Sequence, residues 1–111
     1  MAKLESYLNG NFDEILGAVH DGILRGSASA SFEDGSDFAG PNLRCAVRVY
    51  ERYSMFGGNR VSLNVALMHS GGRTFLSAIT SGGSQAVLFK INTLGEEAFL
   101  DRLREIVRRF A

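Results

Sequence analysis

Apolar and polar residues alternate through the central part of the chain, from Leu43 to Ile91. An alternation with a period of two is typical of strands that have one buried face. The stretch is interrupted by three glycine pairs: Gly57-Gly58, Gly71-Gly72 and Gly82-Gly83. Glycine adopts the positive φ angles of tight turns at little steric cost. The pattern therefore predicts a four-stranded antiparallel meander joined by short turns.

The apolar positions also predict how the first two strands pair. These strands, Leu43–Tyr53 and Val61–His69, each carry a regular apolar set: Leu43, Cys45, Val47 and Val49 on the first, and Val61, Leu63, Val65 and Leu67 on the second. Because a shift of one residue would turn every side chain to the opposite face, we expect both sets on the same side of the sheet. That arrangement pairs Val49 with Val65 and Val47 with Leu67, and it requires a three-residue bulged loop, Phe56–Gly58.

The other two glycine pairs suit two-residue turns. A turn at Gly71-Gly72 pairs Leu67 with Leu76, and we expect both glycines to have positive φ. A turn at Gly82-Gly83 places the fourth strand, Ala86–Ile91, beside the third.

Ahead of the meander, the pattern changes from strand to helix and back. Lys3–Leu8 alternates and predicts a short strand. Asn11 is placed to cap a helix that ends near Gly26. Its apolar stripe recurs every three or four residues: Phe12, Ile15, Leu16, Val19 and Ile23. Ser27–Glu33 then predicts a strand of small side chains, and Asp34–Asn42 predicts a loop rich in Gly, Asp and Asn.

A second amphipathic helix is predicted at the C-terminal end, over about Glu96–Phe110. Thr93 lies three residues before Glu96, which is the spacing of a capping box. The apolar stripe of this helix is continuous: Phe99, Leu100, Leu103, Ile106, Val107 and Phe110. Acidic residues open the helix and arginines close it, as the helix dipole favours.

These elements predict a two-layer α+β fold in a single domain, 1–111, with both helices packed on one face of an antiparallel sheet. The element order, β-α-β4/5-α, resembles the TBP-like and helix-grip folds, which host unrelated functions. We expect one core from both layers: Val47, Val49, Val65, Leu67, Leu76, Val87, Phe89, Phe99, Leu103 and Ile106.

Composition narrows the class of protein. The 111 residues are 45% hydrophobic and include one proline and one cysteine, so we expect a compact cytoplasmic domain without a disulfide or a membrane span. The net charge is zero, but acids predominate in residues 1–40 and bases in residues 41–95. This segregation has two interpretations: neutralisation between neighbours in the fold, or an anionic ligand or partner.

Residues capable of chemistry are sparse. The hydroxyl and amide side chains around the third glycine pair form the most plausible polar ligand site: Thr80, Ser81, Ser84 and Gln85. The register places His69 opposite Cys45, but the histidines and the cysteine lack the spacings of a zinc site. We therefore expect no metal, no cofactor and no catalytic residue, and an enzyme is the least favoured class.

The second face of the sheet is more informative. Strand neighbours point to opposite faces, so residues that alternate with the predicted core must lie on the side away from the helices. We expect an interface there: Arg48, Tyr50, Arg52, Met68, Phe75, Ile79 and Leu88. Aromatic and arginine side chains are enriched in the cores of protein interfaces.

Four segments carry a family resemblance: Asp13–Leu16, Gly57–Leu63, Ser77–Ala86 and Lys90–Leu100. They resemble a family of small, uncharacterised bacterial proteins that is known as a domain of unknown function. The resemblance covers most of the chain. It implies a stand-alone bacterial cytoplasmic domain and no particular activity, cofactor or catalytic residue.

Three functions remain open. The first is a non-catalytic binding or assembly module that forms a homodimer through the open sheet face, with Arg48 and Arg52 at the rim. The second is binding of a small hydrophobic or anionic ligand between the curled sheet and the C-terminal helix. The third, nucleic-acid binding by the arginine-bearing face, is weakened by the zero net charge.

Overall fold

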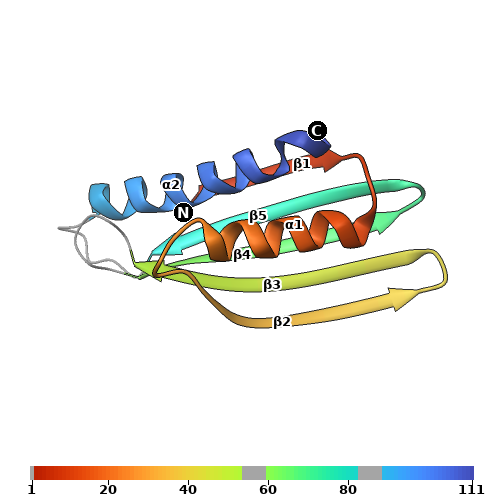
Figure 1. Ribbon diagram of the computed structural model, residues 1–111, viewed down its shortest axis with the longest axis horizontal. Coiled ribbons are helices and arrows are strands. Elements are labelled where there is room, and N and C mark those ends of the chain that lie inside the picture. Colours follow the sequence, from red (N-terminus) through yellow and green to blue (C-terminus); the bar gives the residue numbers. More distant parts are fainter. Residues whose placement is uncertain (1, 54–59, 83–88) are drawn as a thin grey trace.

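A five-stranded antiparallel sheet carries both helices on one face (Figure 1). The computed structural model describes residues 2–53, 60–82 and 89–111, and within the last range it describes side chains from residue 96 onward. The elements follow in chain order: β1 (Ala2–Leu8), α1 (Phe12–Arg25), β2 (Ser31–Gly40), β3 (Leu43–Tyr53), β4 (Arg60–Ser70), β5 (Arg73–Gly82), α2 (Phe89–Val107) and the 3₁₀ turn η2 (Arg108–Phe110). The predicted two-layer α+β architecture is confirmed.

The strand order is β1-β5-β4-β3-β2, so a meander of β2 to β5 is completed by the N-terminal strand. The strand predicted over 86–91 is wrong where the structure describes it, because residues 89–91 belong to α2. Residues 86–88 lie outside the described residues. The place beside β5 is taken by β1, with Leu4 opposite Ala78. A short apolar run does not distinguish a buried strand from a helix, and β1 supplies an equally good alternating partner.

The turn between β4 and β5 is the predicted two-residue turn. Gly71 and Gly72 have φ angles of 60° and 78°, and Leu67 lies opposite Leu76. Both expectations are confirmed.

The register predicted between β3 and β4 is wrong by one residue. Arg48, rather than Val49, lies opposite Val65, and the predicted loop 56–58 lies outside the described residues. Every side chain of β3 is therefore on the face opposite to the one predicted. Tyr50 is fully buried under the helices, whereas the Val47 side chain is 39% exposed on the other face.

Arginine and tyrosine side chains explain this outcome. Arg44 stacks over the Phe12 ring at 4.5 Å, and Arg52 stacks over the Phe99 ring at 4.4 Å. Long arginine side chains cover apolar surface with their methylene groups while the guanidinium reaches a ring or water. The face that looked polar in the sequence is thus the one that packs against α1 and α2.

Helix α1 matches its prediction closely. The Asn11 side chain accepts a hydrogen bond from the Glu14 backbone N–H at 3.0 Å, and Gly26 is the C-terminal cap. Four members of the predicted stripe are buried: Phe12, Ile15, Val19 and Ile23. Gly22 allows close contact with α2, because a Cβ there would lie 2.7 Å from Ile106 Cδ1.

Two element boundaries differ from expectation. Strand β2 begins at Ser31, after the start predicted for it, and continues to Gly40 through the stretch expected to be a loop. As an edge strand it tolerates the Gly and Asp residues that usually indicate a loop, and a bulge lies between Phe32 and Asp34. Helix α2 begins at Phe89, so Thr93 is inside the helix and is not its cap.

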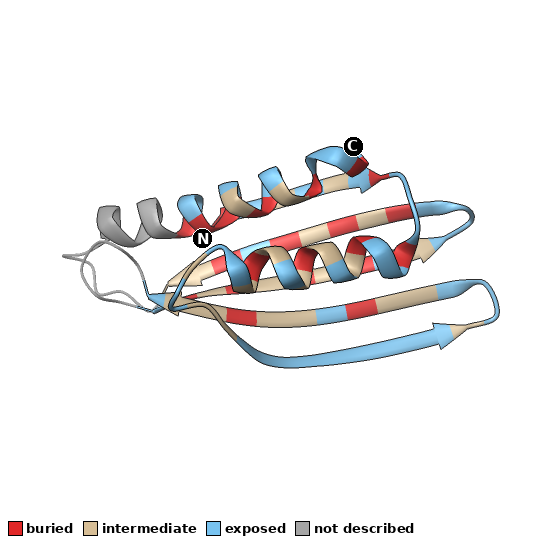
Figure 2. Ribbon diagram, in the orientation of Figure 1, coloured by how far each residue is buried: buried red, intermediate tan, exposed pale blue. Residues whose placement is uncertain are grey.

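One continuous core lies between the helices and the sheet (Figure 2). Of the predicted core, five residues are buried: Val65, Leu67, Leu76, Phe99 and Leu103. Ile106 packs against them partly buried, whereas Val47 and Val49 lie on the other face of the sheet. The side chains of Val87 and Phe89 lie outside the described residues.

Truncation of a core residue of α2 tests the docking of this helix. Leu103 is fully buried, so Leu103→Ala is expected to lower the free energy of unfolding by about 2–5 kcal/mol, because it removes apolar contacts and leaves a cavity. The measurement is urea denaturation followed by circular dichroism. Glu97→Ala on the exposed side of the same helix is the control, with a change within about 0.5 kcal/mol. A loss below half a kcal/mol for Leu103→Ala would mean that α2 is not docked as described.

Candidate interaction surfaces

The sheet face away from the helices, here called the open face, carries a row of apolar side chains. The strand register aligns five residues across all five strands: Tyr7, Phe75, Met68, Cys45 and Phe38. The rings of Tyr7 and Phe75 are 5.2 Å apart, and the Arg73 guanidinium lies 3.8 Å from the centre of the Tyr7 ring. This row links one edge of the sheet to the other.

A parallel row lies farther along the strands: Lys3, Ile79, Asn64, Val49 and Asp34. Between the two rows lies a third row of mixed polar and apolar residues: Glu5, Ser77, Ala66, Val47 and Ser36. Exposure is high for such apolar side chains, at 55% for Tyr7, 61% for Phe38 and 41% for Met68. Contiguous exposed apolar surface of this kind marks interaction sites in folded proteins.

The structure divides the predicted interface residues between two faces. Met68, Phe75 and Ile79 lie on the open face as expected. Arg48, Tyr50 and Arg52 lie on the helix-covered face, because the register of β3 is shifted by one residue. Leu88 lies outside the described residues. Five residues of the open face were not predicted there: Tyr7, Phe38, Cys45, Val47 and Val49. Tyr7 could have been predicted, because it alternates with the apolar residues Leu4 and Leu8 in the first strand and therefore points to the opposite face.

Of the predicted polar ligand site, the structure describes Thr80 and Ser81. Thr80 is fully buried, and its Oγ1 lies 3.3 Å from both the backbone N and the backbone O of Ala2, which fastens β1 to β5. Ser81 Oγ lies 3.0 Å from Ser62 Oγ on the neighbouring strand. Ser84 and Gln85 lie outside the described residues.

His69 and Cys45 are not opposite each other, in contrast to the prediction. Cys45 lies opposite Met68 on the open face, and His69 Nδ1 lies 2.7 Å from Thr74 Oγ1 on the helix-covered face. Among residues 2–53, 60–82 and the described part of α2, no three His, Cys, Asp or Glu side chains come together as metal ligands.

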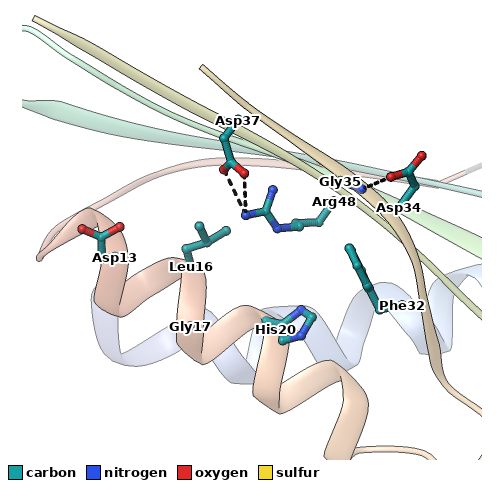
Figure 3. A pocket seen from close by; sticks show the side chains of 9 residues that line it. All are labelled: Asp13, Leu16, Gly17, His20, Phe32, Asp34, Gly35, Asp37 and Arg48. Carbon is teal, nitrogen blue, oxygen red and sulfur yellow. Dashed lines mark hydrogen bonds and ion pairs between the residues drawn. The ribbon is translucent and has the colours of Figure 1, made fainter. Parts of the chain in front are cut away.

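A second surface, here called the α1–β2 groove, lies on the helix-covered side of the sheet (Figure 3). It has a volume of about 590 Å³. Residues of α1, β2 and β3 line it: Asp13, Leu16, Gly17, His20, Phe32, Asp34, Gly35, Asp37 and Arg48. In Figure 1 helix α1 runs over the middle of the sheet, and β2 lies at the sheet edge beside it.

Three aromatic rings form one end of the groove. The His20 ring lies edge-on to Phe32 with 5.3 Å between their centres, and Phe32 lies 5.9 Å from Tyr50. His20 Nδ1 lies 2.9 Å from the Tyr50 hydroxyl. Burial raises the pKa of the Tyr50 hydroxyl to about 12, against the smaller opposing effect of the Arg48 charge. The phenol therefore stays protonated and available for the hydrogen bond with His20.

The Arg48 side chain crosses over β2 at Gly35, where hydrogen bonds and an ion pair fix its position. Its Nη2 lies 3.0 Å from Asp37 Oδ1, and its Nη1 donates to the backbone carbonyls of Ser36 and Val47. Any side chain at position 35 would displace it, because a Cβ there would lie 3.0 Å from Arg48 Cδ. The Arg48 side chain is only 16% exposed, whereas that of Asp37 is 62% exposed. The groove therefore presents the carboxylate to water and keeps the guanidinium beneath it.

Asp13 forms the acidic wall on the helix side. Its carboxylate pairs with Arg44 at 2.9 Å and remains 69% exposed. The hydrogen bond from Arg44 lowers the pKa of Asp13 below its ordinary value, so the carboxylate is ionised at neutral pH.

Gly17 keeps the groove open from the side of α1. A Cβ at this position would have no atom within 4 Å, so packing does not require glycine here. Glycine inside a helix costs about 1 kcal/mol relative to alanine. The helix thus carries, on its groove side, a destabilising residue that packing does not require.

These features define a small α+β domain with two exposed surfaces, one apolar and one acidic with an aromatic end. The chain belongs to a family of unknown function, DUF6054, whose model matches residues 1–111. No curated protein and no solved structure matches it. No helix among the described residues is long and apolar enough to cross a membrane.

The raised pKa of Tyr50 gives a direct spectroscopic test. Titration of the tyrosinate absorbance at 295 nm is expected to show an ionisation near pH 12 that is absent from Tyr50→Phe. Because the folded pKa lies above the unfolded value of about 10, folding stability is expected to fall as the pH rises from about 10 to 12. Loss of an ionisation near pH 10 in Tyr50→Phe, in place of one near pH 12, would show that the hydroxyl is accessible to water.

The two glycines of α1 make a matched pair. Gly17→Ala is expected to raise the free energy of unfolding by up to about 1 kcal/mol, because the helix gains propensity without a clash. Gly22→Ala is expected to lower it, because Ile106 has to move away from the new Cβ. Urea denaturation measures both. Destabilisation by Gly17→Ala would mean that position 17 is packed.

Proposed function

We propose that this protein is a non-catalytic assembly module that forms a homodimer through the open face. A single observation carries the proposal: the apolar side chains of the open face match themselves when the face is turned about its central strand. The strand order has β4 in the middle, with two strands on either side. A two-fold axis along β4 in the plane of the interface places β5 over the partner's β3, and β1 over the partner's β2.

The apolar residues of the two outer rows then meet apolar residues, whereas in the row between them Val47 faces Ser77 and Glu5 faces Ser36. In the first row Met68 faces its own copy, Phe75 faces Cys45, and Tyr7 faces Phe38. In the second row Ile79 faces Val49. Packed sheets rotate by about 30° relative to each other, so these are neighbours rather than strict partners. A two-fold axis perpendicular to the strands would instead place the row that contains Tyr7 and Phe75 against the partner's row that contains Lys3 and Asp34.

The charges at the ends of the second row support the same axis. Lys3 lies on β1 opposite Ile79, and Asp34 lies on β2 opposite Val49. The two-fold axis along β4 brings Lys3 of each copy to Asp34 of the other. Opposite charges at the rim set the register of an association more than its strength.

The competing functions have less support. Arg44, Arg48 and Arg52 lie on the helix-covered face, so the open face has no excess of cations for a phosphate backbone. The space between α2 and the sheet contains Phe99 and Leu103, both buried, where a small ligand was expected. The single cysteine, Cys45, supports a cytoplasmic location for the dimer.

Sedimentation tests the dimer. The wild type is expected to sediment as a dimer at micromolar concentration, and Met68→Glu as a folded monomer. At the two-fold axis the new carboxylate faces its own copy, and like charges across an interface cost roughly several kcal/mol. Ala98→Glu adds the same charge on the exposed side of α2 and is expected to leave the dimer intact.

A charge exchange tests the axis. Lys3→Glu and Asp34→Lys are each expected to weaken association, and the double variant is expected to restore it. A wild type that sediments as a monomer at high micromolar concentration would refute the homodimer. Additive losses in the double variant would refute the axis.

A further inference from the structure

We propose that the outer edge of β2, together with the α1–β2 groove, binds an extended basic peptide that adds a sixth strand to the sheet. The groove lies on the opposite side of the sheet from the dimer face, and only one acid of the edge, Asp34, belongs to both sites. Two independent features support it, an unpaired strand edge and an acidic groove beside that edge.

The edge is long and accessible. Strand β2 runs over ten residues and, among the described residues, pairs only with β3. Almost every residue of β2 is exposed (Figure 2). An edge strand of this length presents a row of backbone N–H and C=O groups to which another strand can bind. The stretch after the bulge, from Asp34 to Gly40, pairs regularly with β3, so its outer groups are regularly spaced.

The chemistry of the edge indicates a basic partner. Strand β2 contains Glu33, Asp34 and Asp37 and no basic residue. Asp13 adds a further carboxylate across the groove. Asp13 and Asp37 remain 69% and 62% exposed although each is paired with an arginine. Arg48 does not oppose a cation strongly, because its guanidinium lies beneath these carboxylates and is bonded to Asp37 and to two backbone carbonyls.

A second copy of β2 does not suit this edge. The three acids fall within five residues at the middle of the strand, so an antiparallel pairing of two β2 edges would bring them close to their own copies. Like charges on neighbouring strands are destabilising. The acids thus disfavour edge-to-edge self-association and favour a strand that carries lysine or arginine.

The groove accounts for specificity. A strand added about 4.8 Å outside β2 would direct alternate side chains to the helix-covered side. There they lie beside Gly35 and Asp37, where a long basic side chain can extend toward His20 and Phe32 (Figure 3). Gly17 leaves this path open. The aromatic rings would contact the methylene groups, and the carboxylates would bind the charged end.

The test uses the full chain with Met68→Glu, so that the open face does not contribute. The probe is a fluorescein-labelled ten-residue peptide that alternates lysine and threonine, and the control peptide has glutamate in place of each lysine. Fluorescence anisotropy is expected to show binding of the lysine peptide only, and binding is expected to weaken as salt is raised. The same titration on the wild type is expected to give the same affinity.

Three variants and one further readout locate the site. Gly17→Leu fills the groove and Asp13→Lys reverses a wall charge; each is expected to weaken binding at least tenfold. Glu14→Lys makes the same charge change beside the groove and is expected to change it less than threefold. Amide hydrogen exchange is expected to slow on alternate residues of β2 when the peptide binds, which binding in the groove alone would not cause.

Several results would overturn the inference. Equal affinity for the glutamate peptide would show that the acids do not select a basic partner. Unchanged amide exchange in β2 would show that the peptide does not add a strand to the sheet. Unchanged binding in Gly17→Leu would show that the peptide does not occupy the groove. If the wild type is a dimer and Gly17→Leu alone is a monomer, the β2 edge binds a second copy of the chain rather than a peptide. Dimerisation through the open face can fail without affecting any of these measurements.

Discussion

The burial of Tyr50 is the constraint on which the rest of the sheet depends. Two helices cover only one face, and the register of β3 determines which of its side chains lie under them. Tyr50 is fully buried and its hydroxyl is satisfied by His20 of α1. Burying this ring moves Arg44, Arg48 and Arg52 to the helix side, where they stack on rings or pair with acids, and moves Cys45, Val47 and Val49 to the open face. Both surfaces of the protein follow from that single choice of register.

Local patterns predicted the parts of the fold that short-range physics determines. The stripe of α1, its cap at Asn11 and the positive φ angles of Gly71 and Gly72 depend on residues close in sequence. The turn also fixes the β4–β5 register, because a two-residue loop leaves no freedom to slide. The α+β class followed from these elements, since an alternating meander flanked by amphipathic helices has few ways to bury its apolar face.

The wrong predictions concern residues whose side chains have a polar group but can still be buried. Counting Val47 and Val49 as core and Arg48 as surface ignored the amphipathic character of arginine and tyrosine. The run at 86–91 was predicted to be a strand because a turn at Gly82-Gly83 would place it beside β5, but β1 takes that place. The groove was not predictable, because Gly17, His20, Phe32 and Arg48 come from three elements and meet only after β3 takes its register. Only the charge segregation indicated it, since the acids of the first forty residues do lie against the arginines of β3.

The pairing of β1 with β5 has a consequence for how the chain folds. Ala2 of β1 lies opposite Thr80 of β5, and the backbone N–H of Asn9, just after β1, donates to the Phe110 carbonyl of η2 at 2.6 Å. Such contacts raise the contact order, and folding slows as loop closure has to precede them. During synthesis at roughly 5–20 residues per second, β1 waits several seconds for its partner strand. Throughout that interval the apolar side of β1 is uncovered, and this is when the chain is most exposed to misassembly with another copy.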